Sequence, residues 1–263
     1  MRLANHSIVA TLMMLAAMLL GLFTTDVVAQ SEYAGRGGTG AINSVYRVLC
    51  PDQNRGGTAF GHKSGQIITA EHLLRDCDVT KLRVIAPSGT STGVSAVKVD
   101  ADLDIALLTP TVNDFVKVPL DVIAETSFTM GAQLSTWGFP EGYSGRNPLL
   151  SVGYLAGVDE RRITPDVVVR KWVVNGAFNR GNSGGPVLEA RTANVVGVIS
   201  SKLAPIPKEL ETRLETLAKN GSGEARTIAE ILQHLRSQTQ LVIGFATMTE
   251  DLRKFLNKNG INP

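Results

Sequence analysis

A serine surrounded by glycines is the most chemically informative feature of the chain, because residues 181–186 read Gly-Asn-Ser-Gly-Gly-Pro. The hydroxyl of Ser183 can act as a nucleophile once a neighbouring base takes its proton. Small flanking residues let backbone N–H groups approach a reacting carbonyl, and the N–H groups of Gly181 and Ser183 could form an oxyanion hole. The alternative is a glycine-rich turn before a strand over 186–189. The specificity of the hexamer favours the nucleophile.

A nucleophilic serine needs a base, and three histidines follow residue 30: His62, His72 and His234. His62 lies in a Gly-His-Lys-Ser-Gly sequence typical of a hairpin turn, and His234 lies in a helical pattern. Both are therefore expected to be solvated. His72 follows an apolar strand pattern that ends at Ala70 and precedes two leucines, so its ring should lie at the edge of a core. We assign His72 as the base.

A buried carboxylate is expected beside the base, because it can orient the imidazole. Asp104 is flanked by Leu103 and an Ile-Ala-Leu-Leu run, as in an apolar strand, whereas Asp100 and Asp102 lie in a more polar stretch. A buried carboxylate is costly unless it is paired, so Asp104 predicts a partner such as the Nδ1–H of His72.

The first 29 residues have the pattern of an export signal. Arg2 gives a positive start, residues 8–23 are sixteen uncharged residues, and Val27 and Ala29 occupy the −3 and −1 positions of a cleavage site. A membrane span needs about 20 apolar residues. Cleavage after Ala29 is therefore favoured over an uncleaved anchor, and residues 30–41 are expected to form a flexible N-terminal segment. The mature protein should be periplasmic or extracellular, without a stable membrane anchor.

Export changes the interpretation of the two cysteines, because disulfides form in oxidising compartments. Cys50 and Cys77 are expected to pair, with two unpaired buried thiols as the alternative. A bridge between them would clamp the loop that carries His72.

The composition excludes several classes of function. Hydrophobic residues make up 43% of the chain, which excludes a disordered tail, and the net charge of +2 gives no electrostatic case for a nucleic-acid partner. Two cysteines without a CxxC pair exclude a disulfide-dense scaffold and a structural zinc site. No metal and no cofactor are predicted.

Short β-rich stretches between Gly, Pro, Asn and Ser residues predict an all-β fold for most of the chain. About six such stretches, from 45–50 to 103–108, precede a linker, and about six follow it, from 133–137 to 241–245. The predicted division is therefore an N-terminal barrel over 42–112, an interbarrel linker over 113–131 and a C-terminal barrel over 132–263.

Helical patterns are confined to the last third of the chain. Apolar residues at helical spacing predict two amphipathic helices in an insertion over 205–240, and a third helix over 248–259. Thr247 and Glu250 have the spacing of a capping box at the start of the third helix. We expect the apolar faces of all three helices to pack on the barrels. Their apolar positions are Leu210, Leu214, Leu217, Ile228, Ile231, Leu232, Leu235, Leu252, Phe255 and Leu256.

Three segments in order, 69–72 (Thr-Ala-Glu-His), 104–108 (Asp-Ile-Ala-Leu-Leu) and 181–186, resemble the catalytic blocks of trypsin-like serine proteases. The asparagine before the serine is similar to the bacterial HtrA-like branch. The resemblance covers 42–202 and resumes at 243–246. It implies two six-stranded antiparallel β-barrels of the chymotrypsin type, with a C-terminal helix and a helical insertion before the last strand.

The resemblance also implies roles for individual residues. His72 would act as general base and then acid, Asp104 would orient it, and Ser183 would form the acyl-enzyme with an oxyanion hole from Gly181 and Ser183. HtrA-like proteins usually carry a PDZ domain, which is not expected in this chain. The insertion over 205–240 is either a lid or docking surface for a partner, or an inert packed element.

The resemblance implies a polypeptide substrate, and the position that selects basic side chains in trypsin-like proteases corresponds to the uncharged Ala177. A small or medium apolar side chain is therefore expected at P1. Residues expected to line the substrate pocket are Ala177, Phe178, Val198, Ile199 and Ser200.

Two functions other than a protease are compatible with a glycine-flanked serine: an esterase and a non-catalytic binding module. An α/β-hydrolase esterase needs an acid and then a histidine after the serine. Only His234 follows Ser183, the acids between them are all glutamates, and the alternation of strands and helices is missing. A non-catalytic binding module of the same fold remains the second alternative.

Overall fold

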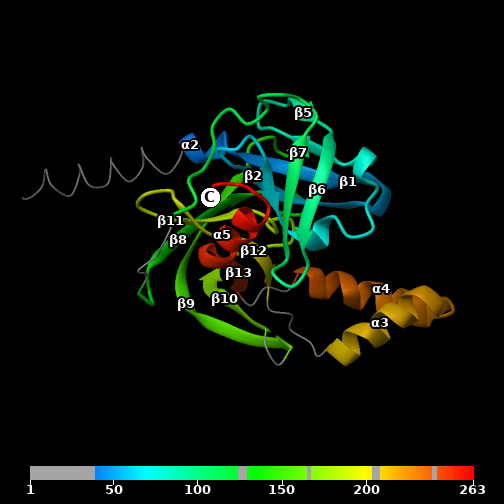
Figure 1. Ribbon diagram of the computed structural model, residues 1–263. Helices are drawn as coiled ribbons and strands as arrows, with labels where there is room; N and C mark the ends of the chain where they lie inside the picture. Colours follow the sequence, from blue (N-terminus) through cyan, green and yellow to red (C-terminus); the bar gives the residue numbers. More distant parts are fainter. Residues whose placement is uncertain (1–38, 124–128, 165–166, 203–207, 239–241) are drawn as a thin grey trace, which may run out of the picture.

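The structure is a computed structural model that describes residues 39–123, 129–164, 167–202, 208–238 and 242–263. The predicted export signal over 1–29 and the segment 30–38 lie outside the described residues. Two β-structures lie side by side, the last helix lies against them, and two further helices project to one side (Figure 1).

The N-terminal β-structure is a curved, nearly closed antiparallel sheet of seven strands, in the order β5-β4-β1-β2-β3-β7-β6. A short helix, α2 (Thr39–Ile42), precedes it. Three single-turn 3₁₀ helices join its strands: η1 (Pro51–Gln53), η2 (Glu71–Leu73) and η3 (Val79–Lys81). The strands are β1 (Val45–Cys50), β2 (Arg55–Gly61), β3 (Ile67–Thr69), β4 (Arg83–Ile85), β5 (Ser91–Thr92), β6 (Val94–Asp100) and β7 (Ile105–Pro110).

The C-terminal β-structure is a closed barrel of six strands in the order β10-β13-β12-β11-β8-β9. Closure leaves no free strand edge within it, so every strand has two hydrogen-bonded neighbours. The strands are β8 (Gln133–Gly138), β9 (Leu149–Thr164), β10 (Val167–Gly176), β11 (Pro186–Glu189), β12 (Val195–Lys202) and β13 (Ile243–Met248).

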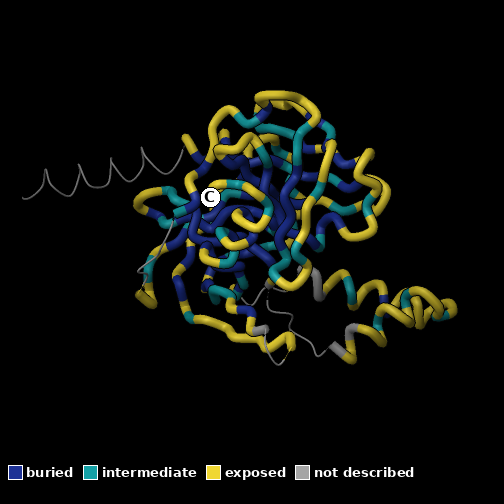
Figure 2. The backbone as a smooth tube through the Cα atoms, in the orientation of Figure 1, coloured by how far each residue is buried: buried dark blue, intermediate teal, exposed yellow. Residues whose placement is uncertain are grey.

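Alternation of side chains along the strands builds a core inside each β-structure and a third core between them. Strand β8 alternates exposed or half-buried with buried positions, as expected for a strand with one face on a core. The third core joins Phe60 and Leu107 of the first sheet, Leu188 and Val198 of the second, and Leu252 of the last helix. Figure 2 shows the buried chain concentrated in these regions. The cleft between the two β-structures therefore has rigid walls.

The last helix, α5 (Thr249–Lys258), packs its apolar face on the molecule, because Leu252, Phe255 and Leu256 are all buried. Its predicted capping box is wrong. The residue before the helix is Met248, and the hydroxyl of Thr247 donates instead to the Leu103 carbonyl at 2.6 Å.

The insertion forms two helices, α3 (Lys208–Asn220) and α4 (Gly223–Gln238), which pack on each other and project from the barrels (Figure 1). The expectation that their apolar faces pack on the barrels is wrong. Ala229 is buried, but Leu210, Leu217, Ile228, Ile231, Leu232 and Leu235 are 44–57% exposed. The physical reason is that each helix uses its partner, not the barrel, as its packing surface.

The predicted fold class is confirmed: a chymotrypsin-like arrangement of two β-structures, with a helical insertion before the last strand and a C-terminal helix. The first sheet has seven strands, whereas six were predicted. The prediction missed β5, because a strand of two residues carries no periodic signal in the sequence. Strand β9 has 16 residues and continues through a charged stretch that pairs with β10. Among the described helices, none is both long and apolar enough to cross a bilayer.

Candidate active site

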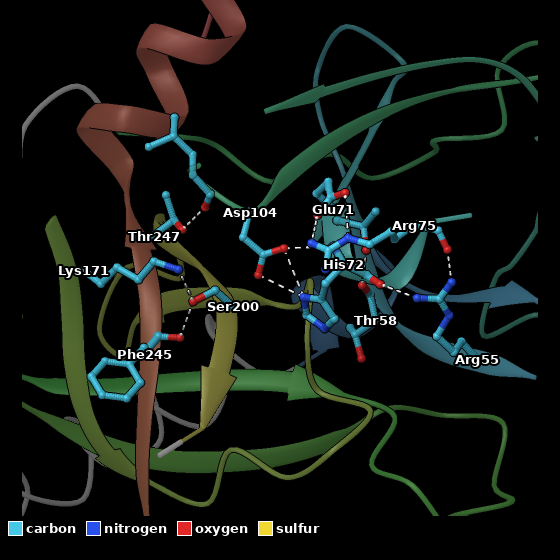
Figure 3. Close-up of polar contacts among 12 residues, drawn as sticks. Arg55, Thr58, Glu71, His72, Arg75, Asp104, Lys171, Ser200, Phe245 and Thr247 are labelled. Carbon is cyan, nitrogen blue, oxygen red and sulfur yellow. Dashed lines mark hydrogen bonds and ion pairs between the residues drawn. The ribbon is translucent and has the colours of Figure 1, made fainter. Parts of the chain in front are cut away.

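The structure brings His72 and Asp104 into direct contact across the N-terminal sheet. His72 lies on η2, directly after β3, and Asp104 lies in the turn between β6 and β7. The Nδ1 atom of His72 is 3.0 Å from Oδ1 and 2.9 Å from Oδ2 of Asp104, and the backbone N–H of His72 donates to Oδ1 at 2.9 Å (Figure 3). These contacts favour a proton on Nδ1 and leave Nε2 as the acceptor.

Asp104 does not lie in a strand, as its sequence suggested, but in a turn with left-handed backbone geometry, φ 58°. Such a conformation is unfavourable for a residue other than glycine and persists only where its surroundings hold it. The neighbouring Leu103 supplies that support, since its N–H donates to Asp100 Oδ1 at 3.1 Å and its carbonyl accepts from the Thr247 hydroxyl. The turn aims the carboxylate at His72.

Ser183 lies in the loop between β10 and β11, where two glycines adopt positive φ: Gly181 at 90° and Gly184 at 81°. A Cβ on Gly181 would lie 2.2 Å from the Phe139 carbonyl oxygen, and a Cβ on Gly184 would lie 2.2 Å from the Thr58 carbonyl oxygen. Only glycine fits both the backbone geometry and the space. The glycines seen in the sequence are therefore structural requirements of the loop that presents Ser183.

Thr58, on β2, fixes this loop, and it was missed in the sequence. Its N–H donates to the Ser183 carbonyl at 2.9 Å, and its hydroxyl donates to the Gly181 carbonyl at 2.6 Å. The same hydroxyl accepts from the Phe139 N–H at 3.0 Å. Thr58 thus joins the N-terminal sheet to the serine loop of the C-terminal barrel. The signal in the sequence was one hydroxyl residue within the stretch Gly-Gly-Thr-Ala-Phe-Gly, which has no other polar side chain.

The N–H groups of Gly181 and Ser183 donate no hydrogen bond to any described protein acceptor, whereas those of Asn182, Gly184 and Gly185 all do. Two backbone donors beside the serine are therefore available to a substrate. Ser183, His72 and Asp104 line one cleft of about 1730 Å³. No hydrogen bond joins the Ser183 hydroxyl to His72 within the described residues.

Comparison with known proteins agrees with this geometry. A family model described as a trypsin-like peptidase domain matches residues 57–198. The chain belongs to the trypsin-like peptidase family. As a member of this family, the protein is a serine endopeptidase.

Solved structures resemble the peptidase in fold. The active form of the Rv3671c protease from M. tuberculosis has a TM-score of 0.61 and 18% identity, over 85% of this chain and 83% of that chain. Its inactive form has a TM-score of 0.58 and 18% identity, over 84% and 90%. The HtrA-type protease AlgW, solved with a tripeptide, has a TM-score of 0.61 and 17% identity, over 88% and 64%. No curated protein matches the sequence.

The cleft of the peptidase extends from the predicted catalytic residues to the helical insertion. Both helices of the insertion contribute polar side chains to it. Residues of α3 and α4 that line the cleft are Glu215, Ala218, Lys219, Arg226, Glu230 and Gln233.

The predicted substrate-pocket residues of the peptidase are only partly brought together. Ser200 lines the cleft. Phe178, Val198 and Ile199 are buried in the cores, and Ala177 is not among the lining residues. Ser201, next to Ser200, also lines the cleft, at a point where the register of β12 against β13 is irregular.

A disulfide between Cys50 and Cys77 closes the loop that carries His72, with 6.0 Å between the two Cα atoms. Arg55 holds the same loop, because its guanidinium donates to the carbonyls of His72 and Arg75. Asp52 lies near both sulfur atoms, so these three residues form a cluster of possible metal ligands. The disulfide consumes both thiols and leaves only the carboxylate, which does not make a metal site.

The other two histidines lie away from the serine loop. His62 is fully buried, contrary to the solvated turn that its sequence suggested, and burial is the main cause that lowers its pKa to about 4. Lys63 lowers this pKa further, while Asp121 opposes the change. The Nε2 atom of His62 has no hydrogen-bond partner in the described structure. His234 is exposed on α4.

Proposed function

We propose that this peptidase cleaves polypeptides through Ser183, His72 and Asp104. The observation that carries the proposal is the paired contact of His72 Nδ1 with the Asp104 carboxylate, in the cleft that Ser183 also lines. In an enzyme without substrate, the contact between serine and base is often long and tightens when substrate binds. The lack of a hydrogen bond between the Ser183 hydroxyl and His72 in the described structure is compatible with an enzyme that has no substrate bound.

The reaction follows from these positions. Nε2 of His72 takes the proton as Ser183 Oγ attacks the scissile carbonyl, and then gives it to the leaving amine. Asp104 stabilises the imidazolium that forms between these steps. A water molecule, activated by the same nitrogen, then releases the acyl group and restores Ser183. The free N–H groups of Gly181 and Ser183 are proposed to hold the developing oxyanion.

The substrate is proposed to carry a small or medium apolar side chain at P1. Support comes from the absence of charge at Ala177 and from Phe178, which closes the space beside Gly244, where an added Cβ would lie 2.1 Å from the ring. Export to the periplasm or the extracellular space is part of the proposal. The leader pattern over 1–29 and the disulfide between Cys50 and Cys77 support it.

The helical hairpin of α3 and α4 is proposed to contact long substrates. Its polar face lines the same cleft as Ser183, through Glu215 of α3 and Gln233 of α4, among others. An extended polypeptide bound at Ser183 would therefore pass this face. The shared cleft supports this proposal over the inert packed insertion considered from the sequence.

The catalytic assignment is tested with a fluorophosphonate probe and an unfolded protein substrate. We expect the wild-type protein to be labelled at Ser183, and the Ser183→Ala and His72→Ala variants to lose labelling and lower kcat by at least about 10⁴-fold. Asp104→Asn should lower kcat by about 10⁴-fold through loss of the correct tautomer.

Cleavage that survives Ser183→Ala would overturn the assignment of the nucleophile. A folded wild-type protein that binds polypeptide without labelling or cleavage would indicate the non-catalytic module. Hydrolysis of esters but not of peptides would indicate the esterase.

A further inference from the structure

Arg47, on strand β1 of the N-terminal sheet, reaches across to the loop between β8 and β9. Its Nη2 atom donates to the carbonyls of Tyr143 at 3.3 Å and Gly145 at 3.0 Å. The guanidinium also lies over the ring of Phe139, 4.8 Å from the ring centroid, where a cation is attracted to the aromatic face. Within the described residues, all hydrogen bonds of this guanidinium go to the segment 139–145.

The segment 139–145 borders the turn that precedes the proposed nucleophile. The N–H of Glu141 donates to the Arg180 carbonyl at 2.7 Å. Gly181 lies directly against the segment, because a Cβ on it would be 2.2 Å from the Phe139 carbonyl oxygen and 2.7 Å from the Glu141 nitrogen. The segment therefore contacts the turn on one side and receives the guanidinium from the N-terminal sheet on another.

The hydrogen bond from Glu141 sets the direction of one proposed oxyanion donor. The Arg180 carbonyl and the Gly181 N–H belong to the same planar peptide unit, in which the C=O and N–H bonds point in opposite directions. While the carbonyl accepts from Glu141, the N–H points away from the segment, and it donates to no described protein acceptor. Glycine tolerates both signs of φ, and residue 181 has φ 90°, so it offers little resistance to rotation of this unit. A contact from outside the turn is needed to hold it.

Two other contacts of the segment do not replace Arg47. The Glu141 carboxylate pairs with Arg180 Nε at 3.1 Å, but the two side chains are 61% and 59% exposed, and exposed ion pairs contribute little. Thr58 accepts from the Phe139 N–H at 3.0 Å and so holds the first residue of the segment. Its other end is attached to the N-terminal sheet through Arg47.

We infer that Arg47 is a positioning residue, which holds the segment 139–145 in place and so keeps the Gly181 N–H directed at the oxyanion through the hydrogen bond from Glu141. The inference rests on the proposed function of the oxyanion donors. Because Arg47 acts through the loop, its loss should slow the chemical step and leave substrate affinity nearly unchanged. Arg47 also lines the cleft, and a direct contact with substrate would instead change KM.

The kinetic test compares wild type, Arg47→Met and Arg47→Lys with a short peptide substrate. We expect kcat to fall by about 10–100-fold in Arg47→Met and KM to change by less than about twofold, because the alignment of one oxyanion donor is partly lost. In Arg47→Lys kcat should fall less, because lysine keeps the charge beside Phe139 and can still donate to a carbonyl.

The matched control is Arg83→Met. Arg83 lies on β4 of the same sheet, is exposed, and does not line the cleft. Its guanidinium also donates to two carbonyls, those of Thr80 at 2.9 Å and Leu82 at 2.8 Å. The control variant should keep the kcat and the KM of the wild type.

A second measurement does not need activity. Hydrogen exchange of the Glu141 amide, followed by NMR, reports how firmly its bond to the Arg180 carbonyl is held. The exchange should become about tenfold faster in folded Arg47→Met, while amides of β7, which lies between two strands, keep their wild-type rates. If Arg47→Met does not fold, Arg47→Lys carries both measurements, with smaller changes in the same directions.

A folded Arg47→Met variant with the kcat of the wild type, or with its exchange rate at Glu141, would overturn the inference. A higher KM at unchanged kcat would also overturn it and would indicate a direct contact with substrate. Absence of fluorophosphonate labelling in the wild type would count against the proposed function alone, because exchange at Glu141 still reports whether Arg47 holds the segment.

Discussion

At the scale of single residues, the site depends on groups that carry no chemistry themselves. Ser183 is presented by a loop that only glycine at 181 and 184 can form, and Thr58 ties that loop to the opposite sheet. Asp104 reaches His72 from a strained turn. The sequence identified the candidate catalytic residues, but it did not identify most of the residues that position them.

Thr58→Val tests this dependence. The variant keeps the shape of the side chain but removes the hydroxyl that donates to Gly181 and accepts from Phe139. Two lost hydrogen bonds should lower the free energy of unfolding by about 2 kcal/mol. Because the loop carries the proposed oxyanion donors, kcat should fall by about 10–100-fold, measured with a short peptide substrate. Thr58→Ser is the control and should retain most activity; an equally active Thr58→Val would show that the glycines alone hold the loop.

At the scale of elements, the helical hairpin departs most from a minimal barrel. It is inserted between β12 and β13, two strands that pair with each other, with Lys202 opposite Gly244. The barrel is therefore closed without it. Its outward apolar side chains do not pack on the barrel, while its polar face borders the cleft. This arrangement fits an element that serves binding more than folding.

Replacing residues 203–242 by a two-residue turn should leave the barrel folded and test this role. We expect KM for an unfolded protein substrate to rise about tenfold, which corresponds to a loss of about 1.4 kcal/mol of binding free energy. Turnover of a small ester, which does not reach the helices, should be unchanged. Ala218→Trp, which fills the cleft, should act in the same direction, whereas Ala225→Trp, at an exposed residue of α4 that does not line the cleft, should not. Equal kinetics for protein and ester in every variant would indicate an inert insertion.

At the scale of the whole molecule, stability depends on a core shared by both β-structures and α5. Cooperative unfolding of the two halves is expected, because residues of each complete the packing of the other. Buried His62 adds a dependence on pH to this stability, since its pKa is lowered from 6.5 to about 4 in the folded protein.

Acid should therefore destabilise the protein between about pH 6.5 and pH 4, because in that range the unfolded chain binds a proton that folded His62 does not. The full contribution is about 3 kcal/mol, lost as the pH falls through this window. His62→Gln should remove that part of the difference between urea unfolding at pH 7 and at pH 4.5. The same pH dependence in wild type and His62→Gln would show that other groups cause it.

The sequence alone predicted both the fold class and a set of catalytic residues, and of these the fold class is confirmed. The segments around His72, Asp104 and Ser183 are local patterns, and alternating apolar residues define most strands without knowledge of their partners. The tertiary structure decided what depends on contacts between distant segments. The buried state of His62, the hydrogen bonds of Thr58 and the exposed faces of α3 and α4 all have this origin. The physical reason is that burial and hydrogen-bond partners are set by residues far away along the chain, whereas periodicity and turn chemistry are set by near neighbours.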